Sequence, residues 1–299
     1  MKIRTLNEYL RETFGTKVYK LSLQSGCTCP NRDGSISYGG CTFCSEGGSG
    51  DFAAPCLSVR EQIALAKKRV DDKFPKRINT QDRKYIAYFQ SFTNTYGDIS
   101  RLYTMYREAL NEEEIVALSI GTRPDCLGDD AMDMIVSLNK IKPVWVEMGL
   151  QTIHEKTALS FNRGYSLAAF ETSYSKLKKS GITVIAHIIL GLPGESETDM
   201  LETVSYLSTL DPCLDGIKIQ NLNILDGTKM AEDYRSKPFK ILSMEEYGSL
   251  LVKCLKILKS ETVIHRMTGD GPKRILIEPV WIADKKKVMN YLNSLIEKS

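Results

Sequence analysis

Four of the eight cysteines lie close together in one glycine-rich segment, between Cys27 and Cys44. Eleven residues separate Cys29 from Cys41, and two separate Cys41 from Cys44. Thiolates are soft ligands that suit zinc and iron–sulfur clusters, and a Cys-x-x-Cys pair brings two of them to one centre from a single turn. The segment therefore predicts a metal centre, and its glycines let the chain bend around that centre.

Two kinds of centre fit this spacing. Cys27, Cys29, Cys41 and Cys44 together would close a structural four-thiolate zinc site. Three thiolates would instead hold a four-iron cluster and leave one iron open to an external ligand. The spacing alone does not decide between them. The other cysteines are interpreted as packing residues, because a free cysteine usually behaves as a small apolar side chain: Cys56, Cys126, Cys213 and Cys254.

The elements that must position this segment alternate between strand-like and helical patterns. The expected strands are Val18 to Leu23, Tyr85 to Gln90, Ile115 to Ile120, Val144 to Leu150, Thr183 to Leu190 and Gly216 to Leu222. The expected helices are Ser58 to Lys73, Ile99 to Leu110, Asp129 to Lys140, Leu167 to Ser180, Glu197 to Leu207 and Met244 to Lys259. This order predicts an α/β fold with a parallel sheet, and six units indicate a partial (β/α)6 TIM-type barrel.

The barrel is expected to occupy residues 18–260, with further structure at both ends of the chain. Residues 1–17 are expected to form an N-terminal helix with Leu6, Leu10 and Phe14 on one face. Residues 261–299 are expected to form a C-terminal α/β extension that acts as a cap. The cysteine segment follows the first barrel strand directly.

Composition places the chain among ordinary folded proteins. Hydrophobic residues make up 42% and charged residues 26%, which excludes collagen-like, mostly disordered and disulfide-scaffold classes. The net charge of +3 neither indicates nor excludes a nucleic-acid partner. Three basic clusters are interpreted as solvated helix faces: Lys67 to Arg69, Lys176 to Lys179 and Lys285 to Lys287.

No segment indicates a membrane or a secretion signal. A membrane-spanning helix needs about 20 apolar residues, and the longest apolar run, Ile182 to Leu192, is shorter and contains His187. The N-terminus carries Glu8 and Glu12, unlike a signal or transit peptide. We therefore expect a cytoplasmic protein without membrane contact.

The run TCPNRDG with GGCTFC, from Thr28 to Cys44, resembles the cluster loop of radical S-adenosylmethionine (radical SAM) enzymes related to the catalytic subunit of Elongator. The resemblance covers nearly the whole chain and includes Gly191 to Glu195 and His265 to Pro272. It implies a 4Fe-4S cluster held by Cys29, Cys41 and Cys44, with Cys27 not a ligand. It also implies SAM as cofactor and an external electron donor of the flavodoxin or ferredoxin type.

The resemblance further implies SAM contacts at the carboxyl ends of the strands, where a barrel places its functional residues. They are Gln90, Ser91 and Thr93 for the methionine amino group, Gln151 and Arg163 for the ribose and carboxylate, and His187 and Gly191 near the adenine. Without the resemblance, a polar turn, a solvated arginine and a buried core histidine would explain the same residues. Glu147 is interpreted as a lumen carboxylate, with Arg123 as its nearest candidate partner.

The substrate implied by the resemblance is tRNA. The Elongator-like branch acts on the C5 side chain of the wobble uridine, and this subfamily resembles enzymes that convert a 5-carboxymethylaminomethyl group to 5-aminomethyl. The segment His265 to Pro272 is expected to close over the barrel mouth, with Arg266 and Asp270 contacting the substrate. Two alternatives stay open: a non-catalytic, zinc-stabilised α/β binding module, and a radical SAM enzyme that acts on a small molecule.

Overall fold

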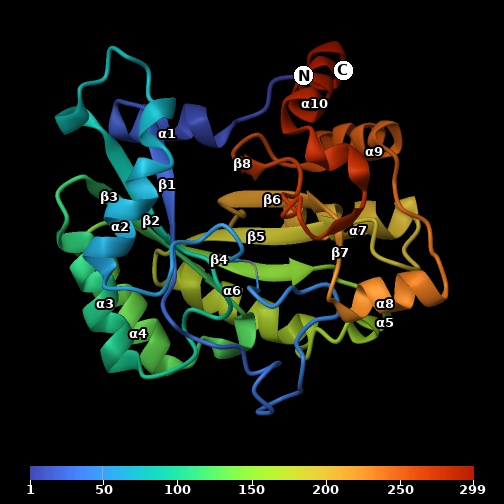
Figure 1. The fold of residues 1–299 in the computed structure, drawn as a ribbon, viewed down its shortest axis with the longest axis horizontal. Coiled ribbons are helices and arrows are strands. Elements are labelled where there is room, and N and C mark those ends of the chain that lie inside the picture. The colour runs from blue at the N-terminus through green and yellow to red at the C-terminus, as the bar shows by residue number, and fades with distance from the viewer. Residues whose placement is uncertain (49) are drawn as a thin grey trace.

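A seven-stranded parallel sheet forms the centre of the protein (Figure 1). The computed structural model describes residues 1–48 and 50–299. The strands lie in chain order: β1 (Val18–Leu23), β2 (Lys84–Phe89), β3 (Ile115–Thr122), β4 (Val144–Gln151), β5 (Thr183–Leu190), β6 (Gly216–Asn221) and β8 (Val263–Arg266). In the described chain β1 and β8 are the two edges of this sheet, so the barrel is partial, as the alternating pattern predicts.

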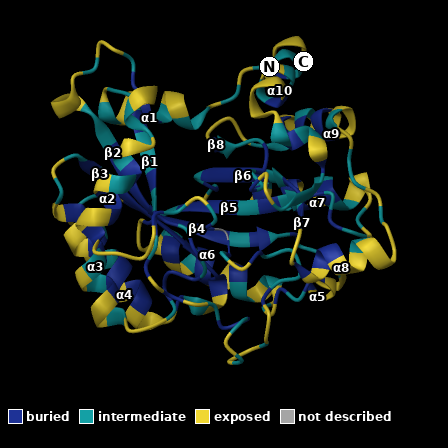
Figure 2. Cartoon of the chain, in the orientation of Figure 1, coloured by how far each residue is buried: buried dark blue, intermediate teal, exposed yellow. Residues whose placement is uncertain are grey.

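Helices follow the strands and cover the sheet. They are α1 (Leu6–Phe14), α2 (Val59–Lys68), α3 (Ile99–Asn111), α4 (Asp129–Asn139), α5 (Glu155–Ser160), α6 (Leu167–Lys179), α7 (Glu197–Thr209), α8 (Lys229–Ser236), α9 (Met244–Ile257) and α10 (Lys285–Lys298). The buried faces of α2, α3, α4, α6, α7, α9 and α10 belong to one large core cluster with the strands, whereas those of α5 and α8 lie in a second cluster and that of α1 in a third. Figure 2 shows the strands largely buried and the exposed residues gathered on helices and loops. None of the helices in the described residues is long and apolar enough to cross a membrane.

The seventh strand differs from the expected count of six. Val263–Arg266 lies within the predicted C-terminal extension, yet it pairs in parallel with β6 as a member of the barrel sheet. The strand has only four residues, too few for a clear pattern along the chain. The rest of the extension contains β9 (Leu276–Glu278), which pairs antiparallel with β7 (Ile224–Leu225), and α10, which packs on α9.

The N-terminal helix α1 closes the bottom of the lumen. Thr5 and Glu8 form a capping box at its start, and Gly15 ends it with a left-handed φ of 72°. Its buried Leu10 packs against strand residues that include Ile86 and Trp145. The amino group of Met1 donates to the Ile296 carbonyl at 3.0 Å, so the two termini meet beside α10 (Figure 1). The polar residues of the lumen therefore lie above a layer of packed apolar side chains.

Candidate functional site

Two adjoining cavities lie at the carboxyl ends of the strands. The first, which we call the thiol chamber, has a volume of about 190 Å³ and is lined by Cys29, Cys41 and Cys44. The second, the lumen pocket, has a volume of about 180 Å³ and is lined by Lys218 and Arg266, among others. The cavities lie side by side, because seven residues line both: Phe43, Cys44, Tyr88, Gln90, His187, Ile189 and Gln220.

Backbone contacts fix the turn that carries two of the chamber thiols. The Cys44 N–H donates to the Cys41 carbonyl at 2.9 Å, which closes the Cys-x-x-Cys turn. Within that turn, the Thr42 N–H donates to the Phe161 carbonyl at 3.0 Å, and the Thr42 carbonyl accepts from the Met230 N–H at 2.9 Å. The turn is thereby tied to the end of α5 and the start of α8.

Two neighbouring residues of the loop motif support the same thiols. The Asn31 amide, which is fully buried, lies 3.7 Å from Cys41 Sγ and donates to the Asn162 carbonyl at 2.5 Å. Arg32 donates to the Cys44 carbonyl at 2.9 Å. The Pro-Asn-Arg part of the motif therefore orients the thiol-bearing backbone and adds no thiol of its own.

Cys27 lies apart from the other three cysteines of the loop. It is 9% exposed, belongs to the main core cluster, and its Sγ accepts from Arg101 at 3.6 Å. It lines a surface cleft on a different side of the loop from the thiol chamber. Three thiols, and not four, therefore face the chamber.

The spacing of the thiols does not match a closed zinc site. One tetrahedral zinc with bonds of about 2.3 Å would hold its sulfurs about 3.8 Å apart. Across residues 1–48 and 50–299, the one group of three or more potential ligand atoms within 4.8 Å of one another is His154, Asp199 and Glu202. A four-iron cluster binds each thiolate through a separate iron, so it accepts sulfurs that lie further apart, and three thiols around one chamber fit it.

The electrostatics of the chamber also suit a cationic centre. Burial raises the pKa of the Cys41 thiol to about 12, and the nearby Cys44 and Cys29 add to the rise. Burial likewise raises the pKa of Cys44, while Arg32 lowers it. Thiols that repel one another's charge in a dry cavity become thiolates when a metal centre offsets that charge.

The loop after β2 brings two of its three predicted SAM contacts to the cavity. Gln90 and Thr93 line the thiol chamber. Ser91 does not: it packs so closely on Gly50 that a Cβ there would lie 1.8 Å from its Oγ. The Ser91 hydroxyl is buried and has no hydrogen-bond partner among the described residues. Ser91 therefore packs against Gly50 and does not face the thiol chamber.

Gln151 reaches the chamber through an irregular end of β4. It has a left-handed φ of 63°, at the point where the pairing of β4 with β5 shifts register. Its Oε1 accepts from the Tyr165 hydroxyl at 2.9 Å. A Cβ at Gly149 would lie 2.4 Å from Gln151 Nε2. The Gly-x-Gln pattern is thus a steric requirement of this orientation.

Arg163 does not line the chamber, in contrast to its predicted contact with SAM. Its guanidinium is 1% exposed and donates to the carbonyls of Leu150, Thr152 and Tyr165 at 2.6 to 3.0 Å. It also pairs with Glu155 at 3.2 Å. In this structure Arg163 holds the end of β4 and the following loop together.

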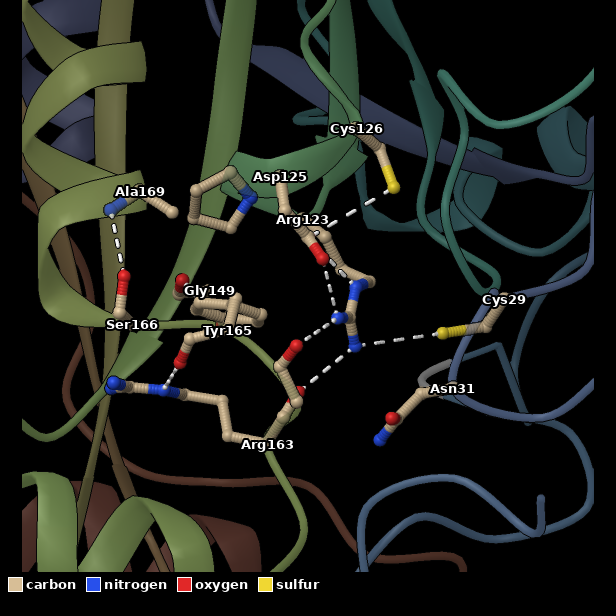
Figure 3. A network of polar contacts seen from close by, with 12 residues as sticks. Cys29, Asn31, Arg123, Asp125, Cys126, Gly149, Arg163, Tyr165, Ser166 and Ala169 are labelled. Carbon is tan, nitrogen blue, oxygen red and sulfur yellow. Dashed lines mark hydrogen bonds and ion pairs between the residues drawn. The ribbon is translucent and has the colours of Figure 1, made fainter. Parts of the chain in front are cut away.

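Arg123, at the end of β3, is the arginine that lines the chamber. Figure 3 shows its guanidinium between Asp125 and Cys29, with the Arg163 side chain turned away from Cys29. Arg123 pairs with both oxygens of Asp125 at 2.9 and 2.7 Å and lies 4.0 Å from Cys29 Sγ. The predicted pairing of Arg123 with Glu147 is therefore wrong, because β3 directs Arg123 upward to the cysteine loop.

The partners of Glu147 come from four other strands, including Ser119 of β3, whose hydroxyl donates to it at 2.7 Å. Its carboxylate accepts from Lys20 at 2.5 Å, from His187 at 2.9 Å and from Lys218, and its side chain is fully buried. Burial alone would raise the pKa of Glu147, but Lys20 and Lys218 outweigh it and hold that pKa well below its usual range. Sequence reasoning missed both lysines, although each is the one charged residue of its strand.

The two residues predicted to lie near the adenine, His187 and Gly191, line different cavities in the structure. His187 lines both cavities, and burial, together with the charge of Lys218, lowers its pKa to about 4. Gly191 has a left-handed φ of 89° and faces Leu242 in a small separate space, away from the chamber. Only His187 is placed to meet a ligand in these cavities.

The segment after β8 lines the lumen pocket. Thr268 Oγ1 and the Gly269 N–H donate to Asn221 Oδ1 at 3.1 and 2.9 Å, which holds the segment over the end of β6. Arg266 and Asp270 both face the pocket. Asp270 also pairs with Lys285 of α10 at 2.5 Å.

A large cleft beside β1 and β8 adjoins the lumen pocket, and both are lined by Lys218, Arg266 and Asp270. We call this cleft the side opening; its volume is about 1,070 Å³. Its acidic residues are Asp51 and Asp270. Its basic residues are far more numerous: Lys20, Arg69, Lys73, Lys218, Arg266, Lys273, Arg274 and Lys285. Sequence reasoning missed this feature because its charges come from six separate segments of a chain whose net charge is only +3.

Comparisons with known proteins agree with this geometry. The profile of the Radical SAM superfamily matches residues 27–207, and that of the Radical_SAM C-terminal domain matches residues 214–298. The chain is 43% identical to the uncharacterized protein YtqA of Bacillus subtilis, over 99% of this chain and 90% of that protein. It is 26% identical to a tRNA uridine(34) acetyltransferase of Methanocaldococcus jannaschii, over 56% of this chain and 31% of that protein.

A solved structure shares the fold. The archaeal Elp3 of Methanocaldococcus infernus superposes with a TM-score of 0.68 over 93% of this chain and 63% of that chain, at 18% identity. The half-barrel with its C-terminal addition is therefore a fold already seen in a solved structure.

Proposed function

The chain belongs to the radical SAM superfamily, and from that premise we propose that it converts the 5-carboxymethylaminomethyl group of tRNA wobble uridine to 5-aminomethyl. The zinc-stabilised binding module is set aside, because members of this superfamily are enzymes that use a 4Fe-4S cluster and SAM. When bound, these two cofactors supply a 5′-deoxyadenosyl radical that abstracts hydrogen from the substrate.

The chain's own residues divide the cofactor binding between them. Cys29, Cys41 and Cys44 hold the cluster. Arg123 faces the same chamber, where its guanidinium, held by Asp125 and by the Arg163 carbonyl, supplies positive charge beside Cys29. Gln151 offers an amide for hydroxyl groups. The predicted contacts from Gln90, Thr93 and His187 also face the chamber, and we retain them as part of the proposed SAM site.

One observation carries the choice of tRNA: the side opening gathers eight basic and two acidic residues and adjoins the lumen pocket. Nucleic-acid binding depends mainly on lysine and arginine contacts to phosphate. A modified base enters the lumen while its backbone stays at the basic rim. The similarity to a tRNA uridine(34) acetyltransferase supports the same substrate class.

An external one-electron donor completes the reaction, because reductive cleavage of SAM consumes an electron. We propose a flavodoxin or ferredoxin as that donor, and a cytoplasmic site of action, where tRNA is found.

Nucleoside analysis of tRNA from a deletion strain tests the proposal. We expect 5-carboxymethylaminomethyl-uridine derivatives to accumulate and 5-aminomethyl derivatives to disappear. The wild-type gene should restore the normal pattern, and the Cys41→Ala variant should not. An unchanged nucleoside pattern in the deletion strain would refute the tRNA substrate and leave a small-molecule substrate as the alternative.

A further inference from the structure

The polar layer of the lumen carries more positive than negative charge. Lys20 and Lys218 share the single carboxylate of Glu147, and Arg266 adds a third cation. Two aspartates also line the pocket: Asp270 is paired with Lys285, and Asp51 accepts from the Ser45 hydroxyl, so one positive charge remains in excess. Burial lowers the pKa of His187 and also that of His265, so neither histidine changes this balance at neutral pH. Lys218 is buried, and Lys20 and Arg266 are half-buried, so an excess of positive charge here is costly unless a counter-charge is bound.

Lys218 and Arg266 stand directly opposite one another on neighbouring strands. They are register partners in the pairing of β6 with β8. Like charges directly opposite across strands are destabilising. Lys218 and Arg266 nevertheless face one another here, and both side chains line the same cavity.

The hydrogen bonds of these two residues leave donors for a ligand. Lys218 Nζ donates to Glu147 and to the Tyr88 hydroxyl at 3.0 Å, so its ammonium form has one N–H group left. Burial lowers the pKa of Lys218 well below its usual range, and a bound carboxylate opposes that shift by favouring the ammonium form. The Arg266 side chain donates no hydrogen bond to any residue within the described chain and forms no ion pair there. Its planar guanidinium suits two-point binding of a carboxylate.

We infer that the lumen pocket binds the substrate's carboxylate between Arg266 and Lys218. The inference rests on the proposed function, in which this group is the carboxylate of the 5-carboxymethylaminomethyl side chain. It assigns Arg266 to that side chain rather than to an RNA phosphate or an exposed base. The positive charge of Arg123 lies in the thiol chamber, on the side proposed for SAM.

This assignment also accounts for product release. The conversion breaks the bond between the side-chain nitrogen and the carboxymethyl carbon, and the carboxylate leaves with the two-carbon fragment. The 5-aminomethyl product keeps the cationic nitrogen of the substrate but has no carboxylate to pair with Arg266 and Lys218, so the pocket holds it less tightly.

Equilibrium binding to the cluster-loaded enzyme, under anaerobic conditions and without reductant, tests the inference. The two probes are tRNA with 5-carboxymethylaminomethyl-uridine at the wobble position and the same tRNA with 5-aminomethyl-uridine. We expect the wild type to bind the first about tenfold more tightly, or better, because a hydrogen bond to a charged group is at stake. Arg266→Gln and Lys218→Gln should bind both tRNAs alike, and Arg266→Lys should recover part of the preference.

Two controls separate this role from general effects. Lys273→Gln with Arg274→Gln, at the rim of the side opening, should weaken both tRNAs equally and leave the preference intact. The affinity of Arg266→Gln for SAM should equal that of the wild type, which would show that this variant is folded. If Lys218→Gln fails to fold, Arg266→Gln alone carries the test.

The outcomes distinguish the inference from the proposed function. A preference that survives in Arg266→Gln, or a wild type with equal affinity for both tRNAs, overturns the inference and leaves the tRNA substrate standing. A wild type that binds neither tRNA refutes the proposed function. In that case saturation-transfer NMR with sarcosine, a small secondary amine with a carboxylate, decides the inference: transfer that Arg266→Gln abolishes supports it, and absence of transfer to the wild type overturns it.

Discussion

At the scale of single residues, the site depends on which side chains face the thiol chamber. Cys29, Cys41 and Cys44 line it, and Cys27 packs into the core beside Arg101. The spacing of the cysteines does not show which of them face the chamber. Because only three do, replacing a chamber cysteine by alanine should affect the cluster, and replacing Cys27 should not.

We expect Cys29→Ala, Cys41→Ala and Cys44→Ala each to lose the cluster, because each removes one of three thiolates. Cys27→Ala, the matched control, should retain it. Anaerobic reconstitution followed by iron and sulfide analysis measures the difference. Loss of the cluster from Cys27→Ala, with zinc in the purified wild type, would contradict the assignment.

The two arginines near the chamber should also behave differently. Arg123→Gln removes the guanidinium that lines the chamber, so we expect SAM to bind about ten- to a hundredfold more weakly with the cluster retained. Arg163→Gln removes the bonds that hold the end of β4, so its main effect should be on stability. Calorimetric SAM binding and urea unfolding distinguish the two, and a normal SAM affinity in Arg123→Gln would refute the contact.

His187 should contribute to the acid sensitivity of the fold. Its folded pKa is about 4, against 6.5 for an unperturbed histidine. As the pH falls below 6.5, the unfolded chain takes up a proton that the folded chain accepts only near pH 4. This residue therefore lowers the free energy of unfolding by up to about 1.4 kcal/mol per pH unit across that window.

The His187→Gln variant isolates this contribution, because it keeps an N–H donor for Glu147 without the titrating ring. We expect its free energy of unfolding to fall less steeply than that of the wild type between pH 6.5 and 5, by urea denaturation. Equal slopes would show that His187 is not the titrating group.

At the scale of elements, the irregular end of β4 directs a polar side chain into the thiol chamber. The strand ends in a register shift, and Gln151 adopts a left-handed backbone that turns its amide into the chamber. The glycine two residues earlier leaves room for that amide.

Gly149→Ala should therefore disturb SAM binding without unfolding the strand. A Cβ at this position would meet Gln151 Nε2 at 2.4 Å and push the amide aside. We expect a weaker SAM affinity at unchanged cluster content. Gly128→Ala is the control, since its Cβ would meet nothing within 4 Å, and an equal effect of both substitutions would contradict the steric argument.

At the scale of the whole molecule, charge is distributed unevenly. The chain has a net charge of only +3, yet the side opening is strongly basic. The half-barrel makes this possible, because its open edge between β1 and β8 brings basic residues from distant segments to one cleft.

The side opening should make tRNA affinity depend on salt. Removing a side chain that binds one phosphate should reduce the slope of log K against log salt by about 1. We expect the Lys273→Gln, Arg274→Gln double variant to lower the slope by up to about 2, measured by titrations at several salt concentrations. A slope equal to that of the wild type would place the phosphate-binding residues elsewhere.

The sequence by itself determined the parts of the molecule that depend on local pattern. The alternation of strand and helix predicted six of the seven barrel strands to within two residues at each end, and the cysteine loop identified the place of the chemistry. The sequence pattern did not predict β8 as a barrel strand, because four residues are too few to show a periodic pattern.

Only the tertiary structure decided which side chains meet. Glu147 pairs with Lys20 and Lys218, which lie 127 and 71 residues away, and not with the nearer Arg123. The register of parallel strands sets these partners, and it brings together residues that no spacing along the chain relates. For the same reason, the basic side opening and the cation pair of Lys218 and Arg266 emerge only when the sheet is assembled.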